Sequence, residues 1–314
     1  MRNTDNIQTG VRVEASPGIL RKIARTVSQN YAAWLIILPS MLIFYFFVWR
    51  PLVAGIGMSF FKLKGYTPVE FVWFKNYVDV MTDTLFLKTI LNTVSYVMWS
   101  LIIGFLPPFI MSVMVNEMVY FKGYFKVSMY LPAIIPSISA SLIWYYMYQP
   151  GAGGLLNMVR GLFGLAPSAW LQNAKLTIPL IITSMTWRGF GGTMVMYLAT
   201  LQGINQELYQ AATIDGAGIL TRIRHVTLPH MRGVLLLLLI RQIIGIFQVM
   251  VEPLAMTGGG PNYASLSLSL QAYNYNFVFG QIDRALALGV ITFVMLVFLT
   301  IAYFLLDKKI GESE

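Results

Sequence analysis

Residues 286–306 read LALGVITFVMLVFLTIAYFLL, an apolar run without a charged side chain. A run of about 20 apolar residues can cross the hydrocarbon core of a bilayer as a helix. Its apolar residues are continuous and do not alternate with polar ones as in a membrane barrel, so a transmembrane helix is predicted. Only 11% of the 314 residues are charged, against about 25% in soluble domains, and the mean hydropathy is +0.66. The sequence therefore predicts a membrane protein.

Similar runs upstream predict an all-α membrane protein with six transmembrane helices. An even number of spans places both termini on one side, and the loops on that side contain more Lys and Arg, which predicts cytoplasmic termini. Prolines inside several runs, among them Pro107 and Pro136, predict bent helices in a packed bundle. The spans are expected at Trp34–Phe61, Ile90–Val115, Phe125–Tyr148, Leu176–Leu201, Val234–Leu254 and Leu286–Leu306.

The predicted domains are a basic cytoplasmic arm at 1–33, a six-helix domain at 34–308 and a cytoplasmic tail at 309–314. The arm is either a basic amphipathic helix lying on the inner membrane face or a polar tail. The first apolar run is too long for a signal peptide, so an uncleaved anchor is expected.

Composition also limits the chemistry. The chain has no cysteine and two histidines, which excludes a disulfide framework and leaves no expected metal site. The formal charge of +9 is interpreted as an orientation signal and a contact with anionic membrane lipid, with no nucleic acid as partner.

The loop before the fifth expected span, at about 203–229, is predicted to be folded. Residues 207–229 read ELYQAATIDGAGILTRIRHVTLP. A short helix is expected up to Ile214, and Gly216 can take the left-handed conformation that ends it. A second short helix follows, and Pro229 is expected to redirect the chain into the fifth span. The small side chains around Gly216 leave room for another surface to approach.

This loop resembles the EAA loop of permease subunits of binding-protein-dependent ABC importers, which has Glu-Ala-Ala, three residues, Gly, and a downstream Leu-Pro. The resemblance implies the type I importer permease fold and a helix that docks on the ATPase subunit. Gln210 stands where the family usually has glutamate, and Glu207 lies one turn earlier on nearly the same face. The implied ATPase-coupling residues are Glu207, Gln210, Ala211, Ala212, Asp215, Gly216, Ala217 and Pro229.

Further blocks look like sugar-type permeases: Gly153 to Asn157, Trp187-Arg188-Gly189, and Thr257 to Pro261. Their order is similar to that of the larger permease subunit of the maltose importer, which has extra N-terminal spans and a periplasmic domain. The resemblance implies ATP-driven import of a sugar or oligosaccharide across the bacterial cytoplasmic (inner) membrane. The implied partners are a second homologous permease, two ATPase subunits and an extracytoplasmic solute-binding protein.

The chain contains no phosphate-binding GxxxxGK[ST] sequence. ATP and Mg²⁺ are therefore expected on the partner ATPase. This subunit is expected to have no catalytic residue and no cofactor of its own.

Ionisable residues inside apolar spans indicate function, and Arg188, Arg241 and Glu252 meet that condition. Arginine beside aromatic and amide side chains suits a sugar, and its guanidinium can bind a carboxylate through two hydrogen bonds, which indicates an acidic or strongly polar substrate. Alternatively, an arginine pairs with Glu252 or with the second permease. Aligned with sugar contacts of the maltose permease are Ser137, Arg188, Gly189 and Gln242. The full expected pathway is Ser137, Trp144, Trp187, Arg188, Gly189, Arg241, Gln242, Gln248 and Glu252.

Three other classes of protein are alternatives. An ABC permease for glycerol phosphate, a polyamine or an amino acid would share the loop, but the Trp187 and Thr257 blocks favour sugars. An ion-coupled carrier is disfavoured by the docking loop and the scarcity of buried acids. A membrane enzyme would need a nucleophile with its base, or a metal site, and the sequence has neither.

Overall fold

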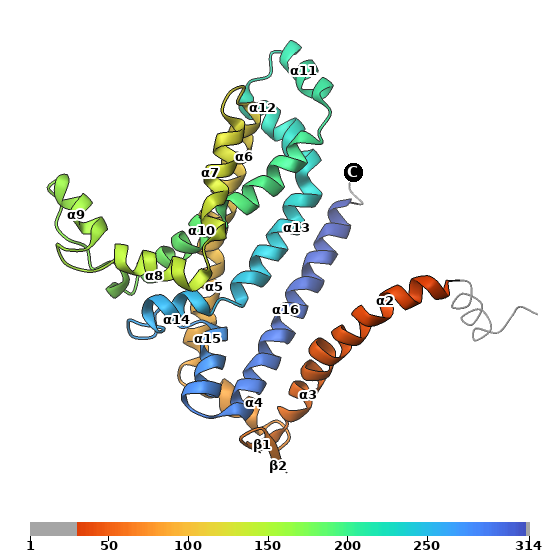
Figure 1. Cartoon of the computed structure of the whole chain (residues 1–314), viewed down its shortest axis with the longest axis vertical. Coiled ribbons are helices and arrows are strands. Elements are labelled where there is room, and N and C mark those ends of the chain that lie inside the picture. The colour runs from red at the N-terminus through yellow and green to blue at the C-terminus, as the bar shows by residue number, and fades with distance from the viewer. Residues whose placement is uncertain (1–29, 312–314) are drawn as a thin grey trace, which may run out of the picture. The chain divides into compact units, whose positions relative to one another are not determined.

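The computed structural model describes residues 30–311, with side chains up to residue 305. The predicted basic arm up to residue 29 and the tail residues 312–314 lie outside the described residues. The chain divides into two units, one up to Gly55 and one from Ile56 onward. Figure 1 shows that helices dominate the chain.

The first unit is built on one apolar helix. α2 (Tyr31–Phe44), the π-helical turn η1 (Tyr45–Trp49) and α3 (Arg50–Met58) run continuously from Tyr31 to Met58. A helix long and apolar enough to cross a membrane therefore stands where the first span is predicted, and it ends at Met58, close to the expected end at about Phe61. All residues of this helix up to Ala54 are exposed, so its apolar surface requires lipid or another subunit around it.

A small β-hairpin follows and corrects the all-α prediction. β1 (Phe61–Lys64) pairs antiparallel with β2 (Thr67–Phe71), and Gly65 in the turn has a φ of +59°. The alternation Phe-Lys-Leu-Lys in β1 is the pattern of a half-buried strand. The buried amide of Asn76 donates to the carbonyl oxygens of Ser59 at 2.8 Å and Phe61 at 2.9 Å, which fixes the hairpin to the next helix.

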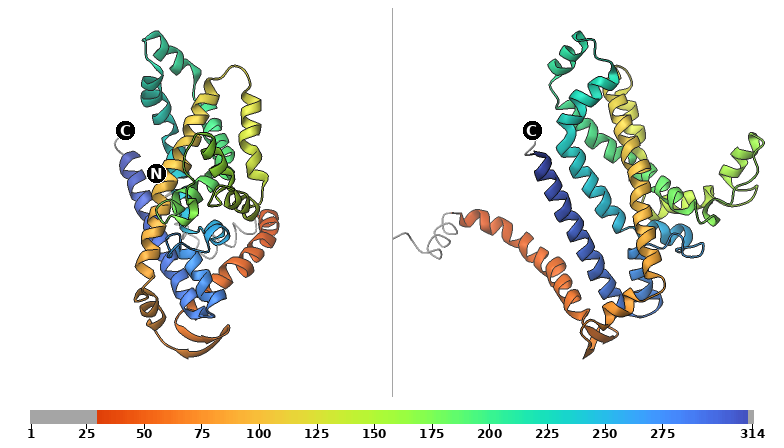
Figure 2. Two further views of the ribbon diagram at one scale, coloured as in Figure 1. Left: turned by 90° about the vertical axis from the view of Figure 1, so that its left-hand side faces the viewer. Right: turned by 180° about the vertical axis from the view of Figure 1, so that it is seen from behind.

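The rest of the second unit is a helical bundle (Figures 1 and 2). Its elements are α4 (Lys75–Met81), α5 (Phe86–Trp99), η2 (Ser100–Phe105), α6 (Leu106–Glu117), α7 (Lys122–Tyr130), η3 (Leu131–Ile134), α8 (Ser137–Met147), α9 (Leu155–Leu162), η4 (Trp170–Gln172), α10 (Thr177–Gln202), α11 (Gln206–Ile214), α12 (Ile219–Arg222), η5 (Ile223–Thr227), α13 (Leu228–Phe247), α14 (Val251–Thr257), α15 (Leu268–Tyr273), η6 (Asn274–Val278) and α16 (Ile282–Gly311). α10 contacts α6 and α13, and α13 also contacts α5 and α16.

Within the described residues, 4 helices are long and apolar enough to cross a membrane, or up to 5 if a bent pair counts as one span. The continuous helices are Tyr31–Met58, Phe86–Glu117, Ile219–Phe247 and Ile282–Leu305. The fourth predicted span coincides with α10, which has 26 residues but is not among the four because it carries many polar residues and glycines. The number of six spans therefore stays a prediction.

Two predicted spans are wrong in their continuity. The third turns by 97° between Ile134 and Ser137, since Ile135 before Pro136 is extended with a ψ of 128°. The fifth ends at Phe247, and a separate short helix, α14, begins at Val251. Glu252 and Pro253 therefore belong to α14; Pro253 lies in its first turn, where a missing N–H is tolerated.

Three prolines inside the continuous helices follow π-helical turns. η1, η2 and η5 each end two residues before a proline, at Pro51, Pro107 and Pro229. A proline lacks the donor N–H and its ring collides with the carbonyl four residues earlier, and a wider π turn lets the helix continue. Pro229 therefore does not redirect the chain as predicted, because α12, η5 and α13 form one helix from Ile219 to Phe247.

Polar contacts fasten the end of the bundle that lies away from α11. The Tyr275 hydroxyl donates to Asp83 Oδ2 at 2.7 Å, and Arg284 Nη2 lies 3.7 Å from Asp79 Oδ2. Burial raises the pKa of Tyr275 to about 12, so its phenol stays protonated and remains a donor at neutral pH. These contacts join α16 to α4 and η6 to the turn that follows α4.

The crossing of α10 and α7 leads to a stability prediction. A Cβ atom at Gly191 would lie 2.3 Å from the Met129 carbonyl oxygen and 2.4 Å from Tyr130 Cα. Gly191→Ala should therefore force the helices apart and cost roughly 1–3 kcal/mol of stability. Thermal unfolding in detergent measures this cost. Gly192→Ala is the control, because nothing lies within 4 Å of its Cβ; equal melting temperatures for the two variants would contradict the crossing.

Candidate functional site

A cavity of about 450 Å³ lies in the middle of the bundle. It is bounded by η2, by the end of α7 with η3, and by the central parts of α10 and α13. Its volume is in the range of small-molecule sites. Its lining residues are Gly104, Phe105, Tyr130, Ala133, Ile182, Met185, Thr186, Arg188, Gly189, Phe190, Gly192, Thr193, Met196, Leu238, Arg241, Gln242, Gly245 and Ile246.

Two arginines give this cavity its charge. Arg188 extends from α10 and is half-buried, and Arg241 extends from α13 with its Nη1 3.2 Å from the sulfur of Met196. Glu252 is buried in α14, and within residues 30–305 neither arginine forms an ion pair with it. The predicted alternative of a pair with Glu252 is not formed. The cavity therefore holds two positive charges without an acidic partner from the described chain, which favours an anionic ligand there.

Uncharged hydrogen-bonding groups complete the lining. A Cβ atom at Gly104 would lie 2.8 Å from Gln242 Nε2 and 3.4 Å from Thr186 Oγ1, so this glycine leaves space for the Gln242 amide. Thr186 and Thr193 add hydroxyl groups, and aromatic rings come from Phe105, Tyr130 and Phe190. Guanidinium, amide, hydroxyl and aromatic groups together suit a polyhydroxylated ring with attached acidic groups.

The structure brings four of the nine predicted pathway residues to this cavity: Arg188, Gly189, Arg241 and Gln242. The other five do not line it. Ser137 begins α8 beyond the 97° turn, Gln248 follows the end of α13, and Glu252 lies in α14. Trp144 and Trp187 pack edge to face with ring centroids 5.8 Å apart.

Sequence reasoning missed several lining residues, notably Thr186, Thr193 and Met196. These share one face of α10 with Ile182 and Gly189, since three or four residues separate neighbours along that face. The spacing from Arg188 and Gly189 could have identified them.

The loop between α10 and α13 adopts the predicted helix and turn. Asn205 caps α11, and its Oδ1 accepts from the Glu207 backbone N–H at 3.0 Å. α11 ends at Ile214, and Gly216 has a φ of +75°, as predicted for a left-handed helix end. Ile214 is 85% exposed and Leu220 is 81% exposed, so apolar side chains are presented here for a partner surface.

A side-chain hydrogen bond joins α11 to the helix that lines the central cavity. The hydroxyl groups of Tyr209 in α11 and Thr227 in η5 are 2.9 Å apart. η5 continues into α13, which carries Arg241 and Gln242. α11 is therefore hydrogen-bonded to the continuous helix that forms one wall of the cavity.

Tyr209→Phe tests this contact. Removing the hydroxyl deletes a bond worth about 1 kcal/mol, so the coupling that the loop's resemblance implies, measured as uptake per ATP hydrolysed, should fall about fivefold. Tyr120→Phe is the control, because Tyr120 is exposed and forms no described hydrogen bond. Unchanged coupling in the Tyr209 variant would argue against this connection.

A bundle of apolar helices around a polar cavity, with a short exposed helix at one end, is an architecture expected of a membrane transport subunit. Residues 86–312 match the family model described as binding-protein-dependent transport system inner membrane component, and the chain belongs to this family. The resemblance inferred from the loop is thereby confirmed.

Its relatives are permeases of sugar ABC transporters. The trehalose/maltose transport system permease protein MalF of Thermococcus litoralis is 30% identical over 271 residues, covering 86% of this chain and 91% of the relative. The arabinooligosaccharides transport system permease protein AraP of Bacillus subtilis is 28% identical, covering 86% of each chain. The crystal structure of a bacterial ABC transporter involved in the import of the acidic polysaccharide alginate matches with a TM-score of 0.81 at 22% identity, covering 92% of this chain and 99% of that chain. This structural likeness establishes the fold.

Proposed function

We propose that this chain is a permease subunit of an ATP-driven importer and conducts an oligosaccharide carrying acidic groups through the cavity of about 450 Å³. The observation that carries the proposal is the lining itself, in which Arg188 and Arg241 lie among threonine, glutamine and aromatic side chains. Charged groups inside a membrane span are costly unless they serve a ligand or a partner. The names of the sugar-transporting relatives support a carbohydrate as the substrate. The alginate importer with the same fold supports acidic groups on that carbohydrate.

The proposed assembly contains a second homologous permease, two ATPase subunits and an extracytoplasmic binding protein in the bacterial inner membrane. In this assembly the chain has six spans with both termini in the cytoplasm. The exposed apolar helix Tyr31–Met58 is covered by lipid or by the second permease. ATP and Mg²⁺ bind to the ATPase subunits, and this chain supplies neither a catalytic residue nor a cofactor.

Transport proceeds by alternating access. Closure of the ATPase dimer moves α11, and the Tyr209–Thr227 contact passes the motion into the helix Ile219–Phe247. That helix forms one wall of the cavity, so its displacement changes the side from which Arg241 is reached. The loaded binding protein and ATP each shift the equilibrium only by binding one state more tightly than the other.

A phosphorylated polyol is the second candidate substrate, because two guanidinium groups without an ion pair among the described residues would bind a phosphate as well as a carboxylate. The Gln242 amide and the aromatic rings around the arginines favour a sugar ring over a short polyol.

Isolation of the complex from its native membrane tests the proposal. A P-loop ATPase and a second permease should co-purify, and ATP hydrolysis with the binding protein should respond to uronate-containing oligosaccharides more strongly than to neutral ones. Stimulation by glycerol phosphate alone would select the second candidate. Purification of the chain without an ATPase would refute both.

A further inference from the structure

A second cavity, of about 260 Å³, lies between the end of α8, η4 and the end of α14. It is farther from α11 than the central cavity is. Figure 1 shows that α10 runs toward α11 and that α13 runs away from it. η4 precedes α10 and α14 follows α13, so both elements lie at the ends of these helices that are far from α11. None of its lining residues is charged, in contrast to the central cavity.

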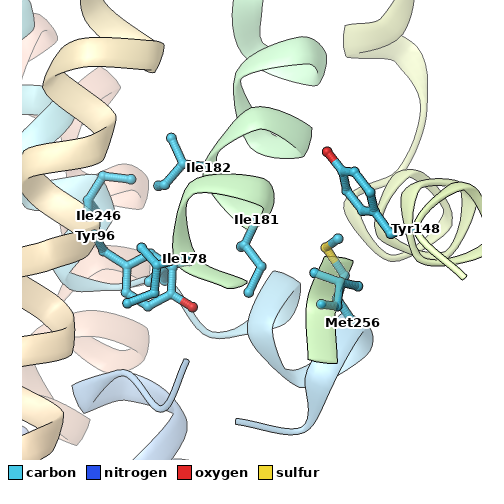
Figure 3. Close-up of a cluster of buried hydrophobic side chains, with 9 residues drawn as sticks. Tyr96, Tyr148, Ile178, Ile181, Ile182, Ile246 and Met256 are labelled. Carbon is cyan, nitrogen blue, oxygen red and sulfur yellow. The ribbon is translucent and has the colours of Figure 1, made fainter. Parts of the chain in front are cut away.

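Unpaired polar groups gather at this second cavity. Tyr148 lines it and is only 3% exposed, yet its hydroxyl has no hydrogen-bond partner among the described residues. The side-chain amides of Gln149 and Gln172 and the hydroxyl of Tyr145 also have no partner in the described part of the chain, but Gln149 is half-buried and the other two are exposed. In Figure 3 the Tyr148 ring lies beside Met256, with its hydroxyl directed away from the sulfur.

Other polar side chains at this end of the bundle do form hydrogen bonds. Asn157 donates to the Gly151 carbonyl oxygen at 2.9 Å and accepts from Trp170 Nε1 at 2.7 Å. The hydroxyl groups of Thr257 and Ser265 are 2.7 Å apart. Since buried polar groups normally find partners, the buried phenol of Tyr148 without one indicates a hydrogen-bonding ligand, which the more exposed amides beside it can also reach.

Packed aromatic rings lie between the two cavities. Trp187 precedes Arg188 of the central cavity, and its ring packs on Trp144, whose ring centroid lies 5.2 Å from that of Tyr148 at the second cavity. The indole Nε1 of Trp144 is buried and has no partner within the described chain. Aromatic faces pack against the C–H faces of sugars, and forked amides pair with their hydroxyl groups.

We infer that the second cavity is a further carbohydrate subsite, which holds an uncharged sugar face of an oligosaccharide whose acidic part occupies the central cavity. The inference deepens the proposed function and rests on it for the acidic part of the ligand. It makes the substrate an oligosaccharide, because a single sugar ring cannot occupy both cavities.

A binding measurement on the purified complete transporter tests the subsite without relying on transport. The transporter is titrated with neutral oligosaccharides of two and five units while its tryptophan fluorescence is recorded, since Trp144 and Trp187 lie beside the subsite. The five-unit sugar should produce a saturable change. The triple variant Tyr148→Phe, Gln149→Ala, Gln172→Ala should bind it at least fivefold more weakly. Tyr146→Phe is the control, because Tyr146 is 67% exposed and does not line the cavity.

The outcomes separate the subsite from the proposed function. Saturable binding that the triple variant weakens would support the subsite even if no acidic sugar were imported. The subsite would be overturned if no fluorescence change were seen, or if the wild type and the triple variant bound the sugar equally. It would also be overturned if only the sugar-free binding protein changed the fluorescence, which would make the cavity a protein-docking surface.

Discussion

Import of an acidic oligosaccharide is expected to fall at least a hundredfold when Arg188 and Arg241 are both replaced by glutamine. Both side chains line the central cavity and have no acidic partner among the described residues. A hydrogen bond to a charged group contributes about 1.5–3 kcal/mol, so losing two costs roughly 3–6 kcal/mol of substrate binding. Uptake by the reconstituted complex measures the effect.

The matched control for this prediction keeps the two positive charges and removes the two-pronged guanidinium geometry. Arg188→Lys with Arg241→Lys should lose less than the glutamine pair, because lysine retains the attraction but not the two-pronged geometry. A neutral oligosaccharide of equal length should be affected little by either pair. Equal loss for acidic and neutral sugars would assign the arginines to assembly instead of to substrate.

Gly216→Val is expected to reduce uptake at least tenfold while the chain remains inserted in the membrane. The φ of Gly216 is +75°, and a left-handed conformation costs a residue with a side chain about 1–2 kcal/mol. A Cβ atom at Gly216 would meet nothing within 4 Å, so the strain comes from the backbone and acts on the end of α11. Uptake and ATP hydrolysis are measured together to show whether the two become uncoupled.

Gly218→Ala is the control for this variant. Gly218 lies in the same loop with a φ of −67° and open space around it, so alanine should be tolerated there. Normal uptake by the Gly216 variant would remove this loop from the coupling path.

The elements that were predicted well have strong local signals. The span ending at Leu306 is continuously apolar, and Gly216 follows a short helix, so α16 and the end of α11 could be placed from the sequence. The interruptions of the predicted spans were harder to place from the sequence. A proline such as Pro136 can bend a helix or end it, and the sequence after Phe247 contains neither glycine nor proline to mark the interruption before α14.

The site could be predicted where charge interrupts an apolar run. Arg188, Arg241 and Gln242 stand out in the sequence and line the central cavity. Trp144 and Trp187 were assigned to the pathway by their neighbours, but they pack on each other outside that lining. Their position depends on the 97° turn before α8, which brings distant segments together and leaves no periodic signal.

Uptake into proteoliposomes that contain the complete transporter and its binding protein tests the central claim most directly. A labelled uronate oligosaccharide should accumulate only with ATP, and its uptake should fall in the Arg188→Gln, Arg241→Gln variant. Accumulation driven by a proton or sodium gradient without ATP would contradict the account.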